Sequence, residues 1–231
     1  LSKPSPMLGR DFIDNNGRHL AAMLKTIAVS EDMALNAISR NIQNILPEIK
    51  RIYVDTDETR QQYVLMVENV DGRKFSSNVL SEGTLRLIAL TALKYDERHR
   101  GLVCFEEPEN GIHPYRMKKM LNLLKELSTD FTCNEDVNYP LRQVIINTHS
   151  PNLVKEFYKD EKHYKGILYF ARLDNRINPK INSTYRVTRL YPVTNKNYVR
   201  LFPNTLPVVT DITQHEVLEY LQWYDDQNTD Q

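Results

Sequence analysis

The chain has 231 residues, of which 41% are hydrophobic and 26% are charged, a composition typical of a folded globular protein with enough apolar side chains for a core. Basic and acidic residues both number 30, so the net charge favours neither a nucleic acid nor an acidic partner. No apolar run approaches the roughly 20 residues that span a bilayer, no secretory leader opens the sequence, and two cysteines make no disulfide framework, so we expect a cytoplasmic protein with no membrane partner.

The first part of the chain is expected to hold two helices followed by antiparallel strands. Apolar residues at helical spacing predict a helix over residues 17–28 and a second helix that begins at Ser30, as its N-cap, and stops at Pro47. The period then becomes that of a strand, with an Asp-Gly hairpin signal, and predicts strands over Ile49–Thr56, Gln62–Asn69 and Arg73–Ser77.

From Leu80 onward the pattern is that of an α/β protein. A helix is expected to begin just after Ser81. Leu102–Phe105 and Val144–Ile146 are short apolar runs, typical of strands buried on both faces, and a helix that opens at Pro114 lies between them. This strand-helix-strand order predicts parallel pairing through a right-handed crossover.

The last third of the chain is less regular. Ile167–Phe170 and Tyr185–Tyr191 are predicted strands, and Thr213–Glu216 has the pattern of a capping box that opens a helix to about Trp223. We expect one domain over residues 1–231, with helices and antiparallel strands over 1–79, the chemical core over 80–165, and strands and a final helix over 166–231.

Three polar motifs carry the candidate chemistry, and the first lies at a helix start. Leu80-Ser81-Glu82-Gly83-Thr84 places free backbone N–H groups and the positive end of the helix dipole beside a serine hydroxyl, and Gly83 lets an anion approach the backbone. A serine N-cap near a glycine is common, so this motif alone indicates only a helix start.

The second and third motifs follow the two predicted buried strands. Glu106 and Glu107 stand at the carboxyl end of the first strand, where open α/β sheets bind ligands. One carboxylate can hold Mg²⁺ through its water shell while the other positions and deprotonates an attacking water, and burial of both without a cation is costly. His149 follows the second strand and lies beside these carboxylates if the two strands are neighbours.

The sequences LSEGT (80–84), CFEEPENGIHP (104–114) and INTHSP (146–151), in this order and at this spacing, resemble the ATP-binding heads of SMC-like and RecF-like ABC ATPases. Among these, the pattern is most similar to the prokaryotic AAA-type ATP-binding proteins related to the OLD family. The resemblance implies the C-terminal lobe of a P-loop NTPase-like α/β head, with a mostly parallel sheet flanked by helices and an antiparallel β segment before it.

The resemblance also implies cofactors and roles. Ser81 and Gly83 would contact the γ-phosphate of ATP bound to a partner head. Glu106 would be the Walker B acid that orients Mg²⁺, and Glu107 the general base for water. ATP would thus join two heads into a homodimer, and hydrolysis would release them.

Two further roles follow from the same resemblance. The segment Glu109–His113 resembles the D-loop, which meets its counterpart across the dimer and places Asn110 at the nucleotide. His149 would be the switch histidine that senses the γ-phosphate.

The chain departs from the family pattern in three places. Glu106 replaces the usual Walker B aspartate, and Glu82 stands where the transporter signature has glycine. No G-x-x-x-x-G-K-[ST] sequence occurs, so no loop cradles the β- and γ-phosphates. We therefore expect a fragment or split half, inactive alone, whose partner is a missing N-terminal Walker A segment.

Other functions compete with an ATPase coupled to DNA repair or to defence against phage. A half-head that never hydrolyses ATP would be a scaffold that presents a partner such as a nuclease, although a scaffold has little need of an intact base at Glu107. The basic segment from Lys165 to Arg200 leaves a DNA contact open, with solvated surface as the ordinary explanation. A metal-dependent hydrolase would use as ligands Glu106, Glu107, Glu109, His113 and His149, whose spacing matches no recognised metal motif.

Overall fold

The computed structural model describes residues 1–8, 12–14, 17–30, 33–129, 141–159, 166–178, 183–194 and 212–213. Contacts divide the chain into two compact units, Leu1–Phe157 and Tyr158–Gln231, and each is treated by itself. The expectation of one domain over residues 1–231 stays a prediction.

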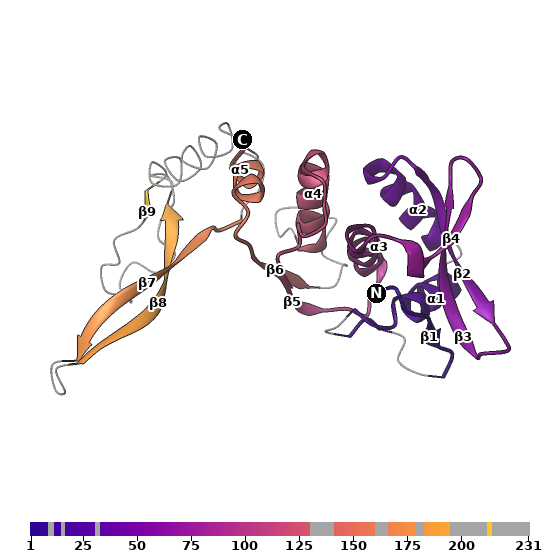
Figure 1. The fold of residues 1–231 in the computed structure, drawn as a ribbon, viewed down its shortest axis with the longest axis horizontal. Coiled ribbons are helices and arrows are strands. Elements are labelled where there is room, and N and C mark those ends of the chain that lie inside the picture. The colour runs from indigo at the N-terminus through magenta and orange to yellow at the C-terminus, as the bar shows by residue number, and fades with distance from the viewer. Residues whose placement is uncertain are drawn as a thin grey trace. The chain divides into compact units, whose positions relative to one another are not determined.

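The first unit contains an antiparallel sheet of four strands (Figure 1). β2 (Ile49–Asp57) pairs with one edge of β3 (Gln62–Asn69). The other edge of β3 pairs with β1 (Ser5–Pro6) at one end and with β4 (Lys74–Ser76) at the other. The three predicted strands are confirmed, whereas β1 was not predicted.

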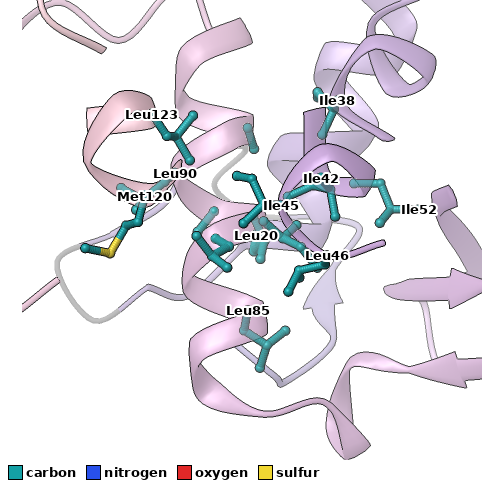
Figure 2. Close-up of a cluster of buried hydrophobic side chains, with 14 of the residues drawn as sticks. Leu20, Ile38, Ile42, Ile45, Leu46, Ile52, Leu85, Leu90, Met120 and Leu123 are labelled. Carbon is teal, nitrogen blue, oxygen red and sulfur yellow. The ribbon is translucent and has the colours of Figure 1, made fainter. Parts of the chain in front are cut away.

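Four helices build the core of this unit against the sheet (Figure 1): α1 (Leu20–Ser30), α2 (Ala34–Ile45), α3 (Glu82–Tyr95) and α4 (Met117–Leu127). α1 and α2 pack on the sheet, and α3 packs against both of them and against α4. α3 buries residues around most of its circumference, as a central helix must. Figure 2 shows Leu20, Ile42 and Leu85, from three of these helices, in the cluster.

The predicted start of the second helix at Ser30 is wrong. Ser30 is the last residue of α1, where its hydroxyl donates to the Thr26 carbonyl at 3.0 Å, and α2 begins at Ala34. A serine hydroxyl can bond the carbonyl four residues back as readily as it can cap a helix, so the residue type alone does not separate an end from a start. The predicted stop at Pro47 agrees with the end of α2 at Ile45.

β5 (Gly101–Glu106) and β6 (Arg142–Asn147) form a two-stranded parallel sheet, and α4 lies between them in the chain. The predicted strand-helix-strand unit with parallel pairing is therefore confirmed. A short 3-10 turn, η2 (Pro114–Arg116), precedes α4. One face of the β5–β6 sheet packs toward the core, through Val103, Phe105, Val144 and Ile146.

The prediction that these strands are buried on both faces is wrong. Leu102 is 53% exposed, Ile145 is 49% exposed, and Cys104, which stands opposite Ile145 in the register, is also exposed. We call this side of the sheet the open face. An apolar run predicts a strand, but it does not show whether other described segments of the chain cover both faces of the sheet.

The expectation of a mostly parallel sheet is also corrected. Among the described residues the parallel pairings are β5–β6 and a short contact between β8 and β9, and the other pairings are antiparallel. None of the described helices is long and apolar enough to cross a membrane.

In the second unit, β7 (Tyr169–Asn178) and β8 (Ser183–Thr194) form an antiparallel ribbon, and β8 also pairs with β9 (Ile212–Thr213). The strand predicted over Tyr185–Tyr191 is confirmed within β8, whereas the strand predicted over Ile167–Phe170 overlaps β7 only at Tyr169 and Phe170. The helix expected to run to about Trp223 lies outside the described residues.

Candidate functional site

The carboxyl ends of β5 and β6 bring the second and third motifs together. Glu106 stands opposite Asn147 in the parallel register, and the N–H of Glu107 donates to the Asn147 carbonyl at 2.8 Å. α5 (Pro151–Lys159) begins directly after the third motif. The residues after each strand therefore share one edge of the sheet, as the predicted pairing requires.

The Glu107 carboxylate is held by side chains from both loops. His149 Nδ1 lies 2.7 Å from Oε1, and Asn110 Nδ2 donates to Oε2 at 2.6 Å. An ionised carboxylate only accepts hydrogen bonds, so Nδ1 of His149 carries the proton and Nε2 is the acceptor in the neutral ring. The His149 side chain is 77% exposed and that of Glu107 is 32% exposed, so both remain accessible to a ligand.

The backbone of Glu107 adopts an unusual conformation. Its φ is +46°, a left-handed value that costs a non-glycine residue about 1–2 kcal/mol. The Glu107 carbonyl accepts a hydrogen bond from Arg86 Nη1 at 2.9 Å, and Arg86 is also paired with Glu82 at 2.8 Å. These contacts connect the start of α3 to the loop that follows β5.

Arg86 was missed in the sequence analysis. Its position four residues after Glu82 predicts an ion pair along the helix, and this ion pair is present. The same spacing gives no sign of the second hydrogen bond, which Arg86 donates to a loop residue 21 positions away.

Glycine is required at position 83 by close packing. A Cβ atom there would lie 2.1 Å from the carbonyl oxygen of Gly111, which itself has a φ of +76°. The contact fixes the start of α3 against the loop after β5. The predicted approach of an anion to Gly83 is a separate matter and stays a prediction.

Ser81 caps α3 as predicted. Its Oγ accepts the N–H of Thr84 at 3.2 Å and lies 2.9 Å from the Thr84 hydroxyl. Ser81 itself is exposed, so its hydroxyl lies on the surface at the positive end of the helix dipole.

Glu109 joins the two loops from beneath the site. The residue is only 8% exposed, and its Oε1 accepts a hydrogen bond from the Thr148 hydroxyl. Thr148 Oγ1 in turn accepts the N–H of Ser150, the residue after His149, at 3.0 Å. Oε2 of Glu109 is buried without a hydrogen-bond partner among the described residues. Sequence reasoning gave Thr148 no role, because an internal loop contact leaves no local pattern.

Glu106 and His113 lie apart from this network. Glu106 is exposed, and strand alternation places it on the same side as Leu102 and Cys104, the open face. His113 Nδ1 accepts the N–H of Tyr115 at 3.4 Å, and the two rings stack with centroids 5.2 Å apart. Over the described residues, no three His, Cys, Asp or Glu side chains are arranged to hold a metal ion.

The amino end of β6 is anchored by a buried arginine. Arg142 is 7% exposed and donates to the carbonyls of Lys94, Asp96 and His99, at the end of α3 and beyond it. Burial, and then the Arg142 charge, lower the pKa of His99. This anchor fixes β6 against α3, and so fixes the position of the loop at the opposite end of the strand.

Comparison with known proteins gives one family and several structures. The family profile described as "AAA domain, putative AbiEii toxin, Type IV TA system" matches residues 11–155. A structure described as "Structural biochemistry of ATP-driven dimerization and DNA stimulated activation of SMC ATPases" is similar at 10% identity and a TM-score of 0.42, over 71% of this chain and 88% of that one.

Two Smc head domains with coiled coils are similar as well. For the head from Pyrococcus furiosus the identity is 8% and the TM-score 0.42, over 74% of this chain and 37% of that one. For the head from Pyrococcus yayanosii the values are 10% and 0.43, over 88% of this chain and 30% of that one. The chain thus spans less than half the length of either of these two chains.

Proposed function

The chain belongs to the family of AAA domains described as "AAA domain, putative AbiEii toxin, Type IV TA system", and we propose that it forms the signature and Walker B half of an ATP-hydrolysing site. The Glu107–His149 contact at the carboxyl edge of β5 and β6 carries this proposal. It joins the two side chains that the chemistry needs together, a carboxylate base and a histidine, from motifs about forty residues apart in the chain.

In the proposed mechanism, Glu107 accepts the proton of the attacking water. Asn110 and His149 hold its two oxygens, so the carboxylate is oriented before the nucleotide arrives. Because Glu107 binds His149 through Nδ1, Nε2 is the ring atom free to meet a phosphate oxygen, to which it donates a hydrogen bond when the ring is protonated.

Mg²⁺ fits the donor set at the end of β5. Glu106 offers exposed carboxylate oxygens there, and the described residues supply no complete protein cage. This suits a hard cation that takes one or two carboxylates and fills its shell with water and phosphate oxygens. When bound, Mg²⁺ would neutralise charge that develops on the phosphates, and Glu106 would hold it through water.

The open face of the β5–β6 sheet supports a partner segment that carries the Walker A loop. Parallel sheets occur almost only with both faces covered, yet Leu102, Cys104 and Ile145 are exposed here. Glu106 emerges on the same side. We therefore propose that the Walker A segment packs on the open face and brings the nucleotide phosphates to Glu106.

Head dimerisation is the proposed output of this site. Ser81 is exposed at the start of α3 and would meet the γ-phosphate of ATP on a second head. Arg86 connects this helix to the Glu107 backbone, so contact with the second head is transmitted to the base. We propose that the cycle of joining and release serves DNA repair or defence against phage.

The test is ATP hydrolysis by the complete protein, in which a Walker A segment accompanies this chain. Glu107→Gln keeps the shape of the side chain but removes the base, so turnover is expected to fall by at least about a hundredfold. Glu58→Gln is the matched control: Glu58 is exposed and far from Glu107 in the sequence, so the rate should be unchanged. A Glu107→Gln protein with the wild-type rate would overturn the assignment, and a wild type that never hydrolyses ATP would favour the scaffold alternative.

A further inference from the structure

The β7–β8 ribbon carries an excess of positive charge, although the chain as a whole has none. Its two strands carry four arginines (Arg172, Arg176, Arg186 and Arg189) and a single acid, Asp174, in a chain whose basic and acidic residues balance overall. The proposed ATPase uses none of these residues.

The register sorts the arginines onto the two faces of the ribbon. Arg172 stands opposite Arg189, and Arg176 stands opposite Tyr185. Residues that pair across the two strands point to the same side, and so do alternate residues along one strand. Three arginines and Tyr185 therefore lie on one face, which we call the arginine face. Arg186 stands opposite Asn175 and lies on the other face.

The opposite face has a different character. Leu173, Ile177 and Leu190 lie there with 63%, 69% and 63% of their surface exposed. Apolar side chains form no ion pairs with a charged polymer, so the two faces suit different partners.

Two of the arginines are held in place. Arg172 Nε lies 3.1 Å from Asp174, and its guanidinium lies over the ring of Tyr191, 5.0 Å from the centroid. Arg189 Nε lies 3.8 Å from the same carboxylate. One carboxylate cannot neutralise two guanidinium groups, so the pair keeps a net positive charge.

Arg176 is the unengaged charge of the arginine face. It is exposed, and no described residue forms an ion pair with it. It lies four positions after Arg172 in the strand, which corresponds to about 13 Å along the ribbon.

We propose that the arginine face of the β7–β8 ribbon binds the phosphate backbone of double-stranded DNA. The roughly 12 Å major groove of B-form DNA admits a two-stranded ribbon, whose arginines can then reach the phosphates along the groove. The deep, narrow major groove of A-form RNA does not admit such a ribbon. The inference extends the proposed link to DNA, but its test requires no ATP.

The experiment compares charge reversals at neighbouring positions on opposite faces. Arg176→Glu and Arg186→Glu change the net charge equally and lie side by side along the ribbon, so only the face differs. Binding of the 231-residue chain to a labelled duplex DNA is followed by fluorescence anisotropy, over a series of salt concentrations and without nucleotide.

We expect Arg176→Glu to weaken binding about tenfold at low salt and to lower the slope of log K against log salt by about 1, whereas Arg186→Glu changes affinity less than about threefold. The same chain should bind an RNA duplex of equal length more weakly.

Three results would overturn the inference: no binding of the wild type at low salt, equal losses in both variants, or equal affinity for the RNA duplex. Circular dichroism of each variant shows whether it is folded, and Arg176→Gln, which removes the charge without adding repulsion, should give a smaller loss in the same direction. Loss of ATPase activity would leave all these results unchanged, so the two proposals fail separately.

Discussion

On one side of the β5–β6 sheet, Val103 and Val144 pack toward the helical core, whereas on the other side Leu102 and Ile145 are about half exposed. Both sides are apolar, so the difference lies in what covers them and not in the residues themselves. The covered side is held by α4, within the described part of the chain. The open face ends at Glu106, and this places an apolar docking surface directly beside a candidate Mg²⁺ ligand.

The largest expected change in stability comes from removing a leucine side chain on the covered side of the β5–β6 sheet, compared with one on the open face. Leu124 of α4 is 1% exposed, so Leu124→Ala should lower the free energy of unfolding by about 3 kcal/mol through the cavity it leaves. Leu102→Ala on the open face should cost less than about 1 kcal/mol. Urea denaturation followed by circular dichroism measures both. Equal losses would mean that the open face is covered in solution.

A smaller loss is expected where packing is closest. Gly83→Ala forces a Cβ against the Gly111 carbonyl and should cost about 2 kcal/mol, because neither backbone segment can yield freely. Glu82→Ala at the neighbouring exposed position is the control, and should change the free energy of unfolding by less than about 0.5 kcal/mol. A Gly83→Ala protein as stable as the control would show that α3 and the loop are not packed as described.

A pH-dependent contribution is expected from the antiparallel sheet. Hydrogen bonds from Lys50 and then Arg51 hold the pKa of Glu68 below its ordinary value of 4.5. A lowered pKa means stability that is present above pH 4.5 and is lost as the pH falls through the folded-state pKa.

Glu68→Gln should therefore be less stable than the wild type at neutral pH, with the gap closing below pH 4.5. Thermal unfolding over a pH series measures the gap, and Glu58→Gln serves as the exposed control. A gap that is constant with pH would exclude the ion pair as its source.

The smallest change in stability is expected on the open face itself. Cys104→Ser should alter the free energy of unfolding by less than about 0.5 kcal/mol, because the thiol is exposed. In a Cys133→Ser background the Cys104 thiol should react with a maleimide, and a bound Walker A segment should protect it. Equal labelling with and without that segment would argue against docking on this face.

Local signals in the sequence predicted those parts of the fold that local contacts decide. Ser81 indicated the start of α3 because a side-chain cap leaves a recognisable pattern, and the apolar runs before Glu106 and Asn147 indicated two strands in parallel. That pairing alone was enough to place His149 beside Glu107.

The remaining features depend on contacts between distant segments. The left-handed backbone of Glu107, the bond from Arg86 to its carbonyl and the buried Glu109–Thr148 contact require the folded arrangement of α3 and two loops. The open face could not be predicted for the same reason, since an apolar strand has the same sequence whether or not a second layer covers it.

The proposed ATPase site requires Glu107 and His149 to act as one unit. ATP hydrolysis should be measured for the complete protein as wild type, Glu107→Gln, His149→Ala and the double variant. If the pair acts together, each single variant loses nearly all turnover and the double variant is no worse than the poorer single variant. Losses that multiply in the double variant, or a single variant that keeps the wild-type rate, would show that Glu107 and His149 do not act as one unit.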